Sequence, residues 1–557
     1  MASGSRGPEA AEAGFRVFLQ DCSAAEPIAV SDLDGSMHWC QHALTQLCRH
    51  AGAKEICLRL SNGSSAYSNG TGVITTSTAF SGVGTPEVAD EVIAATAAAF
   101  LDNEWQDSWG ERPQTPTFRC EFAVDKSTAC QEELLVLPGG PKHVFENIAE
   151  FCPQECRRMY GLVKGTPAER DNSKLEEALL VTHRPKLRAG CVACGTPCLL
   201  RRCDVHTAGS PCTDHSTLGL QAKFAGKNTK HFYLWASLCK LLQHRLIVHE
   251  NVKAFGVLEL SGAFGDMYFL ARTVSDVATF GWPIHRERQY CFLVHREWFF
   301  LHFMVDPAAQ QLWDNERFAT AFCFQSVIDV AFQRICNYTW HGFLFSEDDV
   351  LAEDMQWARA RKDVKKRWEK APRDAARLDK PDSPWAFLNK GERERYEDYK
   401  KLGFGREACD VGSDPTLRPK SSKDGYLQTL TAGQGLIVVN HGKHKRFMST
   451  EELMASMGFP ITTSQVAAAS GVACQFSHGQ QASALRSGAS VRHATGNAMH
   501  LNVVGAAHLV AFILLGNTSG CQPAVESSKR KPNTRKGKRK GLSLAAASLS
   551  SVRAKTI

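Results

Sequence analysis

The sequence predicts an α/β fold built on a doubly wound sheet, and three observations predict it. Short apolar, β-branched runs alternate with segments of helix length over residues 72–297, which is the pattern of strands joined by crossover helices. A glycine-containing loop joins the first clear strand to the first clear helix. Several strands end beside polar or reactive side chains, and ligands of open α/β sheets bind outside the carboxyl ends of the strands.

The first strand is predicted at residues 72–80, GVITTSTAF, because this run is β-branched, uncharged and bounded by glycine. A helix follows directly. Thr85 is expected to cap it, Pro86 suits its first turn, and Val88 and Val92 begin an apolar repeat at helical spacing. The segment therefore predicts a strand, a glycine loop and a helix in that order.

Further strands are predicted within residues 118–124, 142–151, 203–212, 244–252 and 289–297. Before the first strand, residues 1–70 are weakly patterned, with a helix expected at 36–50 and a short strand at 55–60. Near the other end, residues 495–515 are apolar nearly all round, which predicts a buried helix. The most apolar run, 505–516, is too short to span a bilayer, so we expect no membrane partner.

The positive charge is concentrated at the C-terminal end. The net charge is +7, and residues 521–557 hold ten Lys or Arg against one Glu, a local +9, so the rest is near neutral. We expect a basic, disordered tail over 517–557. It predicts a nuclear-import signal, and hence a nuclear location, or an arm on nucleic acid; a solvated tail without a partner is the alternative. Because no apolar secretory start is present, the twenty cysteines are expected to be intracellular and reduced.

The loop after the first strand contains Phe80, Gly82 and Gly84. Glycines there let a ligand approach the backbone, and a helix N-terminus favours polar or negative groups. No lysine follows, so the loop is not a phosphate-cradling P-loop. An acid on the next strand could bind ribose hydroxyls, and Glu121 fits this role, with Asp125 as the second candidate.

Three further groups follow predicted strands. Cys212 stands after a proline in a polar loop, where it is either one more thiol or a nucleophile at the sheet edge. Glu250 follows an apolar strand, and its carboxyl group could donate or accept a proton. Arg286 and Arg288 are two apart on an extended chain, so they project to one face and suit an anion or a carbonyl-rich ligand.

The order of these groups resembles the cytosine-5 DNA methyltransferases, whose blocks run F-x-G-x-G, P-C, E-N-V, Q-x-R-x-R and G-N. The matching residues here are Phe80/Gly82/Gly84, Pro211/Cys212, Glu250/Asn251/Val252, Arg286/Arg288 and Gly496/Asn497. Gly458-Phe459-Pro460 is similar to the penultimate block. Asn147 stands where an aspartate is usual in the block that touches adenine, and Ile284 stands where the glutamine is usual.

The resemblance implies a class I methyltransferase sheet and a division of the chain. The expected parts are an N-terminal extension of unclear role (1–70), an S-adenosylmethionine-binding catalytic domain (71–300), a target-recognition domain (301–440), C-terminal motifs completing the catalytic domain (441–516) and the basic tail (517–557). The implied partner is double-stranded DNA, with the target cytosine flipped out of the duplex. The target sequence and the oligomeric state do not follow from the sequence.

The resemblance also implies a role for each site residue. Cys212 would add to the cytosine ring, Glu250 would hydrogen-bond it, and Arg288, with Arg286 behind, would orient it. S-adenosylmethionine would lie over the glycine loop. Its expected contacts are Phe80, Gly82, Gly84, Glu121 on the ribose, Asn147 at the adenine, Pro211, and Asn497 near the carboxylate end.

Two alternatives remain open. One is tRNA methylation, since one branch of the family modifies tRNA and carries a Cys-Phe-Thr tripeptide in its recognition domain. This chain has Gln325 two places after Cys323 and a basic tail, which favours DNA. The other alternative is a catalytically inactive, methylase-like regulator, against which the intact Cys212, Glu250 and glycine loop argue.

Four closely spaced cysteines, Cys191, Cys194, Cys198 and Cys203, begin with the C-x-x-C spacing of zinc ligands. All four lie within one short segment, and no distant second pair completes a site. We therefore expect ordinary reduced thiols and predict no metal.

Overall fold

The computed structural model describes residues 27–516 of the chain, with interruptions. The interruptions are 69–71, 163–183, 217–220, 304, 306, 346–365, 367–387, 405–406, 413, 416–423, 431–436, 442–443 and 479–487. The chain divides into two compact units, Met1–Ser519 and Gly520–Ile557. The second unit, like the whole predicted tail from residue 517, lies outside the described residues.

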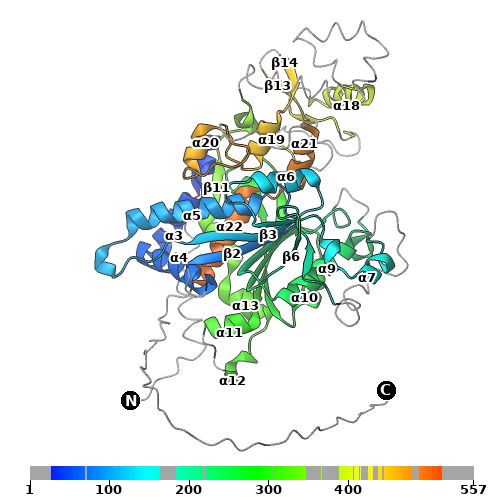
Figure 1. Ribbon diagram of the computed structural model, residues 1–557. Helices are drawn as coiled ribbons and strands as arrows, with labels where there is room; N and C mark the ends of the chain where they lie inside the picture. Colours follow the sequence, from blue (N-terminus) through cyan, green and yellow to red (C-terminus); the bar gives the residue numbers. More distant parts are fainter. Residues whose placement is uncertain are drawn as a thin grey trace, which may run out of the picture. The chain divides into compact units, whose positions relative to one another are not determined.

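The first unit is built on a seven-stranded sheet (Figure 1). Its strands are β2 (Val73–Ala79), β3 (Thr117–Val124), β4 (His143–Phe145), β7 (Val205–Ala208), β8 (Leu246–Val252), β9 (Tyr268–Asp276) and β10 (Glu287–His295). They are ordered β4-β3-β2-β7-β8-β10-β9. Within this sheet, β10 runs in the opposite direction to the other six strands. The order reverses between β2 and β7, which creates a ligand crevice at their carboxyl ends. The predicted doubly wound α/β fold is confirmed.

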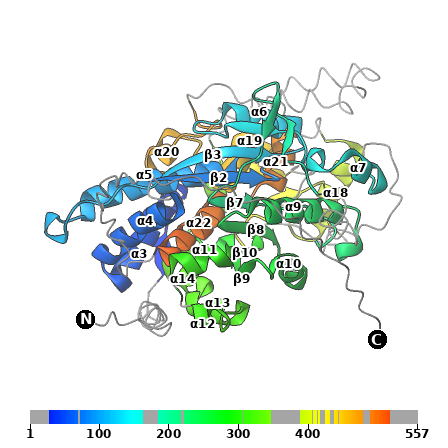
Figure 2. The same cartoon turned by 60° about the horizontal axis from the view of Figure 1, so that its bottom comes forward.

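Each face of the sheet has its own hydrophobic core, because inward and outward side chains alternate along each strand. Leu246 and Val248 join the larger core with α3 (Trp39–Ala51), α5 (Thr85–Glu104) and α22 (Leu501–Leu515). Ile247 joins the other core with α9 (Thr229–Leu242) and α10 (Val257–Phe264). Figure 2 shows α3 and α4 (Ala53–Ser68) on one side of the strands and α9 and α10 on the other.

Residues 27–68 belong to this fold rather than to a separate extension. The helix predicted at 36–50 is present as α3. The strand predicted at 55–60 is wrong, because those residues lie in α4 (Ala53–Ser68). Ile56 and Leu60 are buried one helical turn apart, and this spacing suits a helix as well as the apolar run suited a strand.

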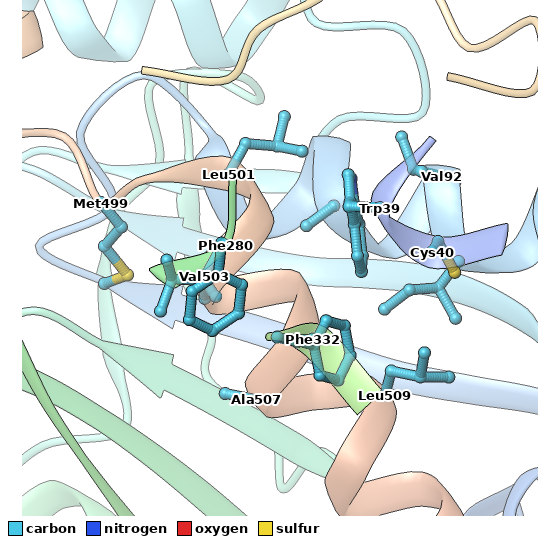
Figure 3. Close-up of a cluster of buried hydrophobic side chains, with 14 of the residues drawn as sticks. Trp39, Cys40, Val92, Phe280, Phe332, Met499, Leu501, Val503, Ala507 and Leu509 are labelled. Atoms are coloured by element: carbon cyan, nitrogen blue, oxygen red, sulfur yellow. The ribbon is translucent and has the colours of Figure 1, made fainter. Parts of the chain in front are cut away.

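The helix predicted near the C-terminus is α22, which is buried along its whole length. The longer helical stretch His493–Leu515 is apolar enough to cross a membrane by length and composition, yet its most apolar window is entirely buried inside the protein. Its side chains pack around Trp39, Phe280 and Phe332 (Figure 3). α22 is therefore a core helix.

Several helices just after residue 300, where the recognition domain is predicted to begin, contribute to the core of the sheet domain. Helices α11 (Arg296–His302), α13 (Asn315–Phe322) and α14 (Phe324–Phe332) pack into the larger core, where Phe324 stacks on Phe292 of β10 at 4.3 Å. Other described elements of the predicted recognition region include α18 (Lys390–Lys401) and β12 (Cys409–Asp410), which pairs with β13 (Ile437–His441). The helices α13 and α14, within the same predicted region, thus belong to the core.

The remaining described elements are short. They are β1 (Ile28–Val30), α2 (Leu33–Met37), α6 (Thr128–Val136), α7 (Gln154–Met159), β5 (Arg188–Gly190), β6 (Pro197–Leu199), α12 (Pro307–Gln310), β11 (Arg334–Cys336), β14 (His444–Phe447), α19 (Thr450–Ser456), α20 (Thr463–Ala468) and α21 (Gly488–Asn497).

Candidate functional site

The glycine loop lies between β2 and α5 and has an unusual backbone. Phe80, Gly82 and Gly84 have φ angles of +55°, +58° and +84°. The left-handed region is strained for an aromatic residue, by about 1–3 kcal/mol, and such strain gathers at functional sites. A Cβ built on Gly82 would meet nothing within 4 Å, so the space over this backbone is open. The cap of α5 is Gly84 rather than Thr85, which is the first residue of the helix.

The acid that reaches this loop is Asp125, directly after β3. Its Oδ2 accepts a hydrogen bond from the Gly82 amide at 2.9 Å, and its Oδ1 accepts one from Ser127 at 2.8 Å. Glu121, the first sequence candidate for the ribose contact, is placed differently. Glu121 lies inside β3, where its Oε1 accepts a hydrogen bond from Arg119 Nε at 2.6 Å, and the strand continues to Val124 before the chain reaches the loop. The second sequence candidate is therefore the better one.

Two asparagines from distant parts of the chain lie near this edge. Asn147 follows β4, and its Oδ1 accepts a hydrogen bond from Ala149, capping a short 3-10 helix, at 2.9 Å. Asn497 ends α21, is exposed, and pairs with His493 Nε2 at 3.1 Å. Burial raises the pKa of Asp125, while the charge of His493 is among those that lower it. This interaction places α21 beside the glycine loop.

The loop that holds Cys212 follows β7 and is fixed from β8. Ser210 Oγ pairs with His249 Nε2 at 2.8 Å. Asn251 Nδ2 donates to the Ser210 carbonyl at 3.0 Å. The asparagine after Glu250 thus positions the residues before the cysteine. The amide of Gly209 also donates to the Ala79 carbonyl at 3.3 Å, which joins this loop to the residue before the glycine loop.

Charged groups from two strands act on the Cys212 thiol. Burial raises the pKa of Cys212 above its ordinary value and Glu250 raises it further, whereas Arg288 and Arg286 lower it. Glu250 lies on β8 opposite Tyr290 of β10. Its Oε1 is 3.1 Å from Arg288 Nε.

Glu250 has a feature that marks it as a ligand-binding group. The residue is 8% exposed, and Oε1 accepts no hydrogen bond within the part of the chain that the structure describes. The contact with Arg288 is therefore a close ion pair without hydrogen-bond geometry. A buried polar atom left without a hydrogen bond costs about 1–3 kcal/mol, so a ligand donor placed here would be favoured.

Arg286 has a supporting position behind Arg288. Its guanidinium is buried and donates to the carbonyls of Ala498, at 2.6 Å, and Leu430, at 3.3 Å. Burial lowers its pKa to about 10, and Arg288 adds to this effect. Because Ala498 follows Asn497 directly, Arg286 ties the nucleophile side of the site to the C-terminal motif.

The structure thus gathers most of the residues predicted from sequence at one sheet edge. The sequence reasoning missed Ser210 and His249, which hold the Cys212 loop, and Met499, whose Cε would lie 2.9 Å from a Cβ on Gly209. Hydrogen-bonding side chains next to the Pro-Cys and Glu-Asn motifs could have indicated the first two. Met499 gave no such signal.

Cys323 and Gln325, whose sequence favoured DNA over tRNA as the substrate, have structural positions. Both lie at the α13–α14 turn on the core, and Gln325 Oε1 accepts a hydrogen bond from Val274 of β9 at 2.8 Å. They are structural residues here, so they do not distinguish DNA from RNA.

Comparison with known proteins gives one clear match. Residues 195–467 match the family model of the C-5 cytosine-specific DNA methylases. This range contains Cys212, Glu250, Arg286 and Arg288, while the glycine loop precedes it. No curated protein sequence matches the chain.

Solved structures give only distant likenesses. A protein described as a DNA modification methyltransferase, encoded within a prophage of E. coli, is 12% identical, with 80% of this chain and 98% of that chain covered and a TM-score of 0.37. The Dnmt2 methyltransferase of S. pombe is also 12% identical, with 79% and 98% covered and a TM-score of 0.37. The fold assignment therefore depends on the strand order described above.

Proposed function

Because the chain belongs to the C-5 cytosine-specific DNA methylase family, we propose that it methylates C5 of cytosine in double-stranded DNA through a covalent bond to Cys212. The family takes the methyl group from S-adenosylmethionine. The observation that carries the proposal is the buried Glu250 carboxylate oxygen, which accepts no hydrogen bond from the described residues although it lies beside Arg288 and acts on Cys212. A flipped cytosine ring supplies the missing donor.

The residues of the glycine loop fit the methyl donor. The open space over Gly82 gives a ligand close access to the backbone. Asp125 and Asn147, after β3 and β4, would bind ribose hydroxyls and the adenine, and Asn497 would contact the carboxylate end. Phe80 and Pro211 would line the same pocket. When bound, the donor supplies an electrophilic methyl group on a sulfonium.

Cys212 makes the cytosine reactive. The C5 atom of cytosine is a poor nucleophile, but a thiolate added to C6 moves an electron pair into the ring and makes C5 nucleophilic. After C5 has taken the methyl group, its proton passes to a base and the bond between C6 and sulfur breaks, which returns the thiolate. The carbonyl of Cys212 accepts hydrogen bonds from His215 and Ser216, both at 2.9 Å, which fixes the backbone of the nucleophile.

Glu250 and Arg288 act on the ring and on the thiolate. Glu250 Oε1 accepts a hydrogen bond from the exocyclic amine or the protonated N3, which offsets charge that builds on the ring. Arg288 orients that carboxylate and stabilises the thiolate. Arg286 is a positioning residue, since its guanidinium donates to backbone carbonyls among the described residues.

The test is methyl incorporation from labelled S-adenosylmethionine into duplex DNA and, separately, into tRNA. We expect incorporation into DNA that is lost in Cys212→Ser and retained in Cys323→Ser, a cysteine of similar partial exposure. Incorporation into tRNA alone would replace DNA by RNA as the substrate. No incorporation into either would favour the inactive regulator.

A nuclear location, proposed from the basic tail, is tested by deleting residues 517–557 and imaging the chain in cells.

A further inference from the structure

A second cluster of reactive side chains lies outside the proposed active site. His143, Cys191, Cys194 and Cys198 each offer one ligand atom, and these atoms all lie within 4.8 Å of one another. His143 begins β4, whereas the cysteines belong to the β5–β6 hairpin and its turn. From sequence, these three cysteines and Cys203 are expected to be ordinary thiols, because no distant ligand is evident. His143 supplies that distant ligand.

The spacing of the ligand atoms fits a tetrahedral metal. His143 Nδ1 is 3.4 Å from Cys194 Sγ and 3.7 Å from Cys191 Sγ. In a tetrahedral zinc site, bonds of about 2.3 Å to sulfur and about 2.0 Å to nitrogen place the nitrogen about 3.5 Å from each sulfur. The observed distances lie on either side of that value.

The backbone of the hairpin presents the cysteines together. Gly195 has a φ of +67°, and its amide donates to the Cys191 carbonyl at 2.9 Å, which closes a tight turn around Cys194. The Cys191 amide donates to the Thr196 carbonyl at 3.1 Å. This turn brings Cys191 and Cys194 to the same end of the hairpin, and Cys198 follows on β6.

The same hairpin docks on the edge strand of the sheet. The Val192 amide donates to the Val144 carbonyl at 2.7 Å, and Cys191 forms an antiparallel bridge with Phe145. This docking brings His143 of β4 to the three thiols. Two segments that are distant in sequence therefore complete one set of four ligands.

We propose that His143, Cys191, Cys194 and Cys198 bind one structural zinc ion. Three thiolates and one imidazole are the soft, four-coordinate set that zinc prefers, and a site with four protein ligands is closed to substrate. Three thiolates and Zn²⁺ carry a net charge of −1, and the positive charges of Lys142 and Arg201 and the negative charge of Glu121 all act on His143. Cys203 is excluded, because it is buried and its Sγ faces the Arg201 carbonyl at 3.6 Å.

The zinc ion would fasten the hairpin to β4, the edge strand of the sheet. β4 is only three residues long, and Asn147 follows it. The metal at one end of the strand would thus hold in place the asparagine proposed to contact adenine at the other end. The zinc site does not depend on the proposed methyl transfer, because its ligands are separate from Cys212 and Glu250.

The test is metal analysis of the full-length protein, purified without added chelator and again after equilibration with zinc. We expect about one zinc per chain, as a closed four-ligand site requires. Cys194→Ser, which changes the exposed ligand, should lower the zinc content at least about tenfold. His143→Cys keeps a fourth ligand and should retain zinc, and Cys203→Ser should retain it as well.

A second measurement keeps the proposal testable if a ligand variant fails to fold. Replacing the metal of the wild-type protein by Co²⁺ should give the intense visible absorption of tetrahedral, thiolate-bound cobalt. Wild-type protein without zinc after equilibration, a cobalt spectrum without thiolate bands, or equal loss of zinc from Cys203→Ser and Cys194→Ser would each overturn the proposal.

Discussion

At the scale of single residues, the site is governed by opposing charges around one partly buried thiol, that of Cys212. Burial and Glu250 disfavour the Cys212 thiolate, and Arg288 and Arg286 favour it. Glu250 and the two arginines therefore affect the reactivity of the Cys212 thiol in opposite directions. The proposed mechanism needs Glu250 as well as Arg288, because Glu250 hydrogen-bonds the cytosine ring.

This opposition leads to a prediction that separates thiol reactivity from catalysis. Glu250→Gln removes a negative charge, so the pKa of Cys212 should fall and alkylation of Cys212 by iodoacetamide at neutral pH should become several-fold faster. Methyl transfer should nevertheless fall by about 10²-fold or more, as for other lost transition-state contacts. Arg288→Met should slow both reactions. The alkylation rate of Cys212 is read by peptide mass spectrometry, and slower alkylation in Glu250→Gln would contradict the assignment.

The sequence predicts these residues because each motif is local. Pro211-Cys212 and Glu250-Asn251 need no partner to be recognised. The end of β3 determines whether Glu121 or Asp125 reaches the glycine loop, and it depends on pairing with β2 and β4, which the sequence does not show. His143 was missed as a partner of Cys191 because no local signal connects residues so far apart.

At the scale of elements, the close contact between α3 and α22 depends on one glycine. A Cβ built on Gly505 of α22 would lie 2.3 Å from Cη2 of Trp39. The Trp39 indole therefore occupies the space that a side chain at position 505 would need. The residue is a packing requirement inside a helix, where glycine is otherwise unfavourable.

Gly505→Ala should therefore destabilise the protein. The extra methyl group would displace Trp39, and overpacking of this kind costs about 1–3 kcal/mol, more than the ~1 kcal/mol that alanine gains in helix propensity. The matched control is Gly262→Ala in α10, where a Cβ would meet nothing within 4 Å and alanine should stabilise. Urea denaturation of both variants measures this, and a stabilised Gly505→Ala would contradict the packing.

Elements were predictable where the pattern had one interpretation. The strand β2 is β-branched and bounded by glycine, α5 repeats apolar residues at helical spacing, and α22 is apolar nearly all round. Residues 55–60 were ambiguous, since a short apolar run suits a strand or a buried helix. β9 was not predicted at all, because its place as the edge strand is set by pairing with β10 along its whole length.

At the scale of the whole molecule, the core contains several histidines that must stay neutral. Burial lowers the pKa of His244, His249 and His500 to about 3, and the pKa of His42 and His231 to about 4. Below the ordinary value of 6.5 the unfolded chain binds protons that the folded chain does not. The folded state is therefore fully favoured above that pH and loses stability as the pH falls.

The free energy of unfolding should thus fall from pH 6.5 towards pH 4, by about 1.4 kcal/mol per pH unit for each such histidine. Glu87 opposes this in part, because burial raises its pKa to about 7. Urea midpoints at pH 7, 6 and 5 measure the slope. His231→Gln should reduce the number of protons taken up on unfolding by about one, and the slope with it. Equal stability at pH 7 and pH 5 would contradict the claim that these histidines are neutral in the folded protein.

The doubly wound sheet follows from the sequence, but the packing of the helices after residue 300 against that sheet does not. Alternating strands and helices predict the doubly wound sheet. The packing of α13 and α14 on β9 could not be predicted, because charged and apolar residues are mixed after residue 300 and the contacts are long-range. The same limit concealed the histidine of the proposed zinc site.

The central claim is that the sulfur of Cys212 bonds to C6 of the target cytosine. In the most direct measurement, the protein is incubated with S-adenosylmethionine and duplex DNA that carries 5-fluorocytosine. Fluorine replaces the C5 proton and cannot be removed by a base, so the bond between C6 and sulfur should persist. Peptide mass spectrometry should then find one nucleotide adduct, located on Cys212. An adduct on a different cysteine, or active methylation of ordinary cytosine without any trapped adduct, would contradict the account.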